Sequence, residues 1–290
     1  MSGTELAHII FRDSSIGTYD QCSNDLGAGY ASGDTGCRWV NGNLQPNNST
    51  YFEHDATVQR LWLDGLVPGA PHTVTFKYGT TKGGKHAYDY LVKWDHSESW
   101  ITLADLCQGV DDCVGVNVPV SEFAIPDDLN VLNTIEPIGS PIRDMVLRGG
   151  AITNVTTPAI VSGSYVGDSE TVITVSFTVD STDDANDMCV TQGGGANAVT
   201  SCGVAFFFGA HVSSQDDWGA GNSAVNIYGS TYHVALDKVD GASVGQRDNQ
   251  MQSNAVVAPQ GGDITIVKHT VGGNGTFNYT TSNATTTPFS

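Results

Sequence analysis

The sequence predicts an all-β protein, a β-sandwich or jelly roll with one short helix and long loops. The first observation is compositional: 34 glycines accompany abundant Ser, Thr, Asn and Val, while only 15% of the residues are charged. This composition favours short strands and tight turns over helices. The second observation is that short alternating or β-branched segments recur between Gly, Pro, Asn and Asp residues, which is typical of a sandwich rather than of βαβ units.

Eight segments are predicted to be strands because they alternate or are rich in β-branched residues. They are Ala7–Phe11, Arg38–Val40, Thr57–Leu63, His72–Tyr78, Thr171–Val179, Val204–Phe208, Tyr232–Leu236 and Ile264–Val267. From Thr73 to Tyr78 polar and apolar residues alternate strictly. We therefore expect that strand to have one solvent-exposed face and one buried face.

The helix is predicted at Lys85–Trp94, where apolar residues recur at positions i, i+3, i+4 and i+7. Residues 95–150 read as a long, irregular insertion of loop punctuated by prolines. The expected organisation is a sandwich domain over residues 1–260 and C-terminal strands over residues 261–290.

Residues 263–280 read as two strands around a Gly-rich turn. A lone hairpin is marginally stable in water, so this pair must lean on the preceding domain, on further sequence or on another subunit. In the last case it would add a strand to a neighbour, as a donor strand does. The apolar positions that either arrangement needs are Ile264, Ile266, Phe277 and Tyr279.

The charge of the chain and its cysteines indicate which binding partners and which cellular compartment to expect. The chain has 12 basic and 31 acidic residues, a net charge of −19, which disfavours nucleic acid and anionic membranes and favours soluble cations. No apolar run of 18 residues is present, so we expect no membrane insertion. Residues 1–5 carry no signal-peptide pattern, and we expect a mature, extracellular form whose export signal is absent from this sequence.

The six cysteines fall into three close pairs, which would suit local disulfides in an oxidising compartment. Neighbour pairing is one of fifteen connectivities, and reduced buried thiols are the alternative. The pairs are Cys22 with Cys37, Cys107 with Cys113, and Cys189 with Cys202.

Candidate sites for small partners lie on loops. Four carboxylates crowd one loop and could bind calcium, although solvated acidic loops are the default. They are Asp180, Asp183, Asp184 and Asp187. Glycosylation sequons begin at Asn47, Asn48, Asn154, Asn274, Asn278 and Asn283. Trp218, on a polar loop, is the best single candidate for a ligand contact such as stacking on a sugar. The alternative is that its ring packs on a neighbouring strand.

Several segments resemble secreted, multi-domain bacterial surface proteins that carry prealbumin-like (SpaA-type) domains. The similar segments are Asn48–Glu53, Lys82–Trp94, Gly209–Asn222, Gly229–Gly241 and Asp263–Tyr279. The first four resemble a large domain that precedes such repeats, and the fifth resembles the opening strands of a prealbumin-like domain. In related pilin domains a Lys on the first strand forms an isopeptide bond to an Asn, and Lys268 occupies the corresponding position.

No catalytic motif is convincing, and we expect a non-enzymatic building unit of a cell-surface or filamentous assembly. Its partners would be other copies or neighbouring surface-protein domains. Two alternatives stay open. One is a carbohydrate-binding or adhesive module. The other is a glycoside hydrolase, because sequence does not reveal which two of the 31 acidic residues face each other across a cleft.

Overall fold

The computed structural model describes residues 15–24, 37–131, 142–195, 198–245 and 247–258. The chain divides into one unit spanning residues 1–259 and a second spanning residues 260–290. The second unit lies outside the described residues. The predicted strands at Ala7–Phe11 and Ile264–Val267 lie outside them too, as do the assembly positions Ile264, Ile266, Lys268, Phe277 and Tyr279.

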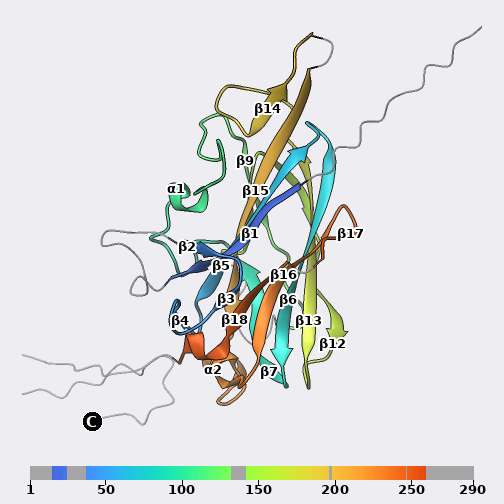
Figure 1. Ribbon diagram of the computed structural model, residues 1–290. Coiled ribbons are helices and arrows are strands. Elements are labelled where there is room, and N and C mark those ends of the chain that lie inside the picture. The colour runs from blue at the N-terminus through green and yellow to red at the C-terminus, as the bar shows by residue number, and fades with distance from the viewer. Residues whose placement is uncertain (1–14, 25–36, 132–141, 196–197, 246, 259–290) are drawn as a thin grey trace, which may run out of the picture. The chain divides into compact units, whose positions relative to one another are not determined.

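Two large sheets make up the described part of the first unit (Figure 1). Sheet A has the order β2-β1-β5-β15-β10-β9, and β14 and β8 also pair with β15. Its strands are β1 (Ser15–Ser23), β2 (Arg38–Val40), β5 (Ala56–Leu66), β8 (Tyr88–Val92), β9 (Val120–Ala124), β10 (Asp144–Arg148), β14 (Cys189–Gln192) and β15 (Val199–Val212).

Sheet B has the order β11-β13-β6-β16-β18-β3, with β12 on β13, β17 on β16 and β7 on β6. Its strands are β3 (Asn43–Leu44), β6 (Pro71–Lys82), β7 (Lys85–His86), β11 (Gly150–Val155), β12 (Ala159–Gly163), β13 (Ser169–Val179), β16 (Thr231–Val239), β17 (Ala242–Ser243) and β18 (Asp248–Gln252). A small parallel pair joins β4 (Tyr51–Phe52) to β19 (Val256–Val257). The helices are α1 (Leu103–Leu106), α2 (Gln215–Trp218), η2 (Ala224–Asn226) and η3 (Ser253–Ala255).

The main core lies between the two sheets, where their inner faces bury one continuous apolar cluster. Aromatic rings join the layers: Phe76 of β6 lies 4.6 Å from Phe208 of β15, and Phe177 of β13 lies 5.0 Å from Phe206, between ring centroids. Such offset and edge-on ring pairs add to the free energy gained by burying their surface. The result is the all-β sandwich that the composition predicts.

A second apolar cluster covers the outer face of sheet A with the segment around α1. Arg60 of β5 organises it, because its guanidinium lies 4.3 Å from the Trp39 ring and donates to the Leu106 carbonyl at 3.0 Å. Residues 95–150, expected as an irregular connection, thus supply a cover for sheet A as well as its strands β9 and β10.

The alternating segments are confirmed as strands wherever they lie within the described residues. In β6 the expected two faces are present, since Val74, Phe76 and Tyr78 are buried while Thr75 and Lys77 are only half-buried.

The helix predicted at Lys85–Trp94 is wrong. The segment forms β7, which turns back on β6, and then β8 at the edge of sheet A. All five residues of β8 are buried, so both faces of the strand are covered. A strand that is buried on both faces does not alternate between apolar and polar residues, so its apolar positions can also fit one stripe of a helix.

Candidate functional site

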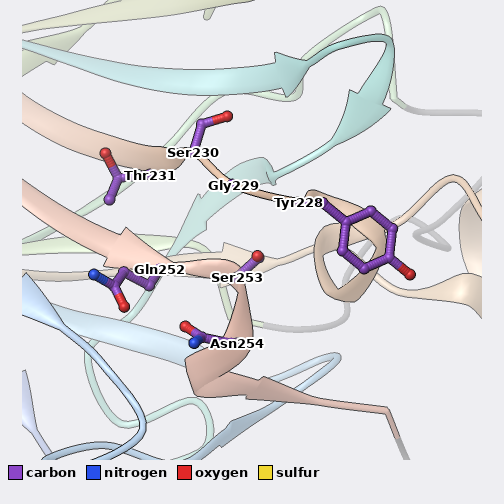
Figure 2. A pocket seen from close by; sticks show the side chains of 7 residues that line it. All are labelled: Tyr228, Gly229, Ser230, Thr231, Gln252, Ser253 and Asn254. Carbon is purple, nitrogen blue, oxygen red and sulfur yellow. The ribbon is translucent and has the colours of Figure 1, made fainter.

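A hollow of about 420 Å³ lies at one end of sheet B (Figure 2). Its position follows from strand register: Thr231 opens β16 directly opposite Gln252, which ends β18. The loop that enters β16 and the turn that leaves β18 therefore meet at the same end of the sheet. The lining residues are Tyr228, Gly229, Ser230, Thr231, Gln252, Ser253 and Asn254.

We call the polar side chains that line the hollow uncommitted, because none of them makes a side-chain hydrogen bond within the described residues. Within the described residues, no hydrogen bond uses the hydroxyls of Ser230, Thr231 or Ser253, or the amides of Gln252 or Asn254. Hydroxyls and amides both donate and accept hydrogen bonds, so this row can serve a ligand that itself carries both kinds of group.

Tyr228 completes the hollow with an aromatic surface. Tyr228 is 80% exposed, an unusual fraction for a residue with a large ring, and Figure 2 shows its ring to one side of the other labelled residues. The next residue, Gly229, has φ +72°, a left-handed conformation that side chains with a Cβ rarely adopt. This turn holds Tyr228 outward while Ile227, on its other side, is buried.

A second cluster surrounds Trp218, the ligand contact that the sequence predicts. Its indole Nε1 donates to Asp89 Oδ2 at 3.1 Å, and its ring stacks on His86 with the centroids 3.3 Å apart. The ring also packs on the small apolar cluster of Tyr90 and Val92. Trp218 is therefore held by packing on β7 and β8 in this structure.

Asp89 anchors this cluster from β8. Its carboxylate is fully buried, and Oδ1 lies 2.7 Å from Nδ1 of His211 on β15, which is also buried. The His211 ring stacks on Tyr90 at 4.3 Å. Two further histidines lie near it, with ring centroids at 5.9 Å for His54 and 5.3 Å for His96.

Burial shifts the pKa of several acidic and basic side chains in this cluster. It raises the pKa of Asp55 and of Asp217 above the ordinary aspartate range. Burial lowers the pKa of His86 to about 4, against a smaller opposing effect of the nearby Asp89. His86 is thus neutral at neutral pH, which is compatible with its stacking on Trp218.

Four buried polar atoms beside this cluster have no hydrogen-bond partner in the structure. They are the hydroxyls of Tyr78 and Tyr165, Oδ2 of Asp128 and Nδ1 of His86. The Tyr165 ring lies 5.2 Å from His86, and the charges of Asp128 and Asp89 both raise the pKa of Tyr78 and Tyr165, after the larger effect of burial. The neighbourhood is polar enough to hold internal water.

The four aspartates predicted to bind calcium converge only in part. Carboxylate oxygens of Asp180 and Asp187 lie within 4.8 Å of each other, together with Sγ of Cys189, which is engaged in a disulfide. Asp187 accepts from the backbone N–H of Cys189 at 2.8 Å and of Asp184 at 2.5 Å. Asp183 accepts instead from the Thr191 hydroxyl. Calcium binding stays a prediction.

The cysteines form three disulfides between sequence neighbours: Cys22–Cys37, Cys107–Cys113 and Cys189–Cys202. Sequon residues Asn47 and Asn154 are exposed. Asn48 is half-buried, and its side chain is used to accept from the Gln45 N–H at 2.9 Å. Asn274, Asn278 and Asn283 lie outside the described residues.

The hollow at Tyr228 was not found from the sequence. Its two halves are more than 20 residues apart, and only the β16–β18 pairing brings them together. The available signal was the sequence from Tyr228 to Thr231, an aromatic residue before a Gly turn and two hydroxyl residues.

Within the described residues, none of the helices is long and apolar enough to cross a membrane. No protein-family model, curated protein or solved structure matches the chain.

Proposed function

We propose that the chain is a non-enzymatic extracellular module of a cell surface, and that the hollow beside Tyr228 binds carbohydrate. The single observation that carries the binding proposal is the combination of a freely exposed tyrosine ring with a row of uncommitted hydroxyls and amides. A sugar ring has apolar C–H faces and a rim of hydroxyls, so it matches an aromatic ring flanked by donors and acceptors.

The extracellular location is supported by the three disulfides, because such bonds form and persist in oxidising environments. The net charge of −19 adds colloidal repulsion that suits a surface-exposed protein.

A glycan array tests the binding proposal. Wild-type protein is compared with Tyr228→Ala, with Trp218→Ala, and with Trp100→Ala as a control for removing an aromatic residue that does not line the hollow. We expect specific signals that Tyr228→Ala abolishes and Trp100→Ala preserves. Signals lost with Trp218→Ala alone would move the site to the sequence-predicted position, and no specific signal for the wild type would overturn the proposal.

Assembly through the C-terminal segment is the second candidate function. It is supported by the apolar alternation at Ile264, Ile266, Phe277 and Tyr279. Added strands gain main-chain hydrogen bonds and side-chain pockets from a neighbouring copy or surface domain. Deleting residues 263–290 should leave the sandwich folded and abolish higher-order association. Unchanged oligomers in light scattering would count against it.

A glycoside hydrolase is the enzyme alternative, and the Asp89–His211 cluster is where it would be sought. Asp55 and Asp217 have raised pKa values there, a property common at catalytic sites and also at structural ones. Turnover of a polysaccharide that Asp217→Asn abolishes would establish this alternative.

A further inference from the structure

The hollow beside Tyr228 adjoins two others. One, of about 250 Å³, shares Thr231 with it. The other, of about 300 Å³, shares Tyr228 and Ser230 with it. These two also share Lys82 and Asp168 with each other. The three hollows are therefore contiguous around the start of β16, and the surface available to a ligand extends well beyond the Tyr228 ring.

Both carboxylates that line these hollows, those of Asp168 and Glu170, are paired with basic side chains. Lys82 Nζ lies 2.6 Å from an oxygen of Asp168. Glu170 Oε1 lies 3.2 Å from Nζ of Lys77 and 3.1 Å from Nε2 of His233. The hydrogen bond from Lys82 lowers the pKa of Asp168, so that carboxylate is ionised at neutral pH.

Lys85, the other lysine that lines these hollows, donates to the Gly221 carbonyl at 2.6 Å and has no carboxylate partner among the described residues. An acidic ligand would thus find one cation, Lys85, that is engaged only by a backbone oxygen, whereas Lys82 is paired with Asp168. It would also approach a chain with net charge −19, which repels anions at long range. A cationic ligand would compete with the lysines that already form ion pairs with Asp168 and Glu170. The uncommitted groups of the first hollow are all uncharged hydroxyls and amides.

We propose that the three hollows form one extended site for a neutral oligosaccharide of two or more sugar residues, with one ring on Tyr228 and the chain continuing over Thr231 towards Ser162. This inference rests on the proposed function and deepens it by naming the ligand class and length. Ser162 lines the second hollow only, and it is exposed on β12. Its substitution therefore tests the extension without touching the Tyr228 end.

The test is isothermal titration with a mono-, di- and trisaccharide series of one neutral glycan selected on the array. For the wild type we expect affinity to rise at least about tenfold from the mono- to the trisaccharide, equivalent to about 1.4 kcal/mol. Ser162→Trp should fill the second hollow and remove that gain while leaving monosaccharide binding unchanged. Ser162→Ala is the matched control and should retain the gain.

The outcomes separate the two proposals. Equal affinities for all lengths, with Tyr228→Ala still abolishing binding, would overturn the extended site and leave the sugar site standing. Tighter binding of a uronic-acid analogue than of its neutral counterpart would overturn the neutral ligand class. Absence of binding by every member of the series would overturn both.

Discussion

His211 Nδ1 lies 2.7 Å from Asp89 Oδ1, and the two side chains are 2% and 0% exposed. The other oxygen of Asp89 accepts from the Trp218 indole, so one buried carboxylate joins β8, β15 and α2. Removing it leaves the buried His211 ring and the half-buried Trp218 indole without this partner, and buried polar groups without partners are costly.

We expect Asp89→Ala to lower the free energy of unfolding by about 3–5 kcal/mol. Asp216→Ala, in the same region but with a side chain 87% exposed, should change it by no more than about 0.5 kcal/mol. Chemical denaturation followed by fluorescence measures both. Equal losses for the two variants would contradict the anchoring role of Asp89.

The Tyr78 hydroxyl is buried without a hydrogen-bond partner, whereas the Tyr51 hydroxyl donates to the Cys22 carbonyl at 2.7 Å. Both side chains are fully buried. Tyr78→Phe should therefore leave the melting temperature unchanged or raise it, while Tyr51→Phe should cost about 1 kcal/mol. A loss at Tyr78 as large as that at Tyr51 would show that an internal partner, such as ordered water, satisfies the Tyr78 hydroxyl.

Burial lowers the pKa of His86 to about 4, well below the ordinary value near 6.5. The unfolded chain therefore takes up a proton between these values while the folded chain does not. Stability from this group is fully present above pH 6.5 and is lost as the pH falls towards 4, by up to about 3 kcal/mol.

Calorimetry from pH 7 to pH 4.5 should show a steeper fall in melting temperature for wild type than for His86→Gln. Asp55 and Asp217 titrate in both proteins, so the difference in slope isolates His86. Parallel curves would contradict the lowered pKa.

If calcium binds at the loop of Asp180 and Asp187, the stability of the protein should depend on calcium. A filled site at 100 times its dissociation constant would add about 2.7 kcal/mol, so a chelator should lower the melting temperature by several degrees. Asp180→Asn, at the half-buried member, should remove the effect. Identical melting curves with calcium and with chelator would contradict calcium binding at this loop.

The sandwich could be predicted from the sequence because strands such as β6 and β13 alternate, and alternation reports one buried face directly. The helix predicted at Lys85–Trp94 is a strand over Tyr88–Val92, because a strand buried on both faces lacks that signal. Trp218 looked available on a polar loop, yet Asp89 and His86, distant in sequence, hold it in place. The exposure of Tyr228 likewise depends on tertiary structure, which no local pattern records.

A crystal structure of the chain with the neutral glycan that the array selects would show whether a sugar ring lies against Tyr228. We expect a ring on the Tyr228 face, with its hydroxyls bound to Ser253, Asn254 and Ser230. A glycan bound elsewhere on the sandwich, or a hollow that stays empty at saturating glycan, would contradict it.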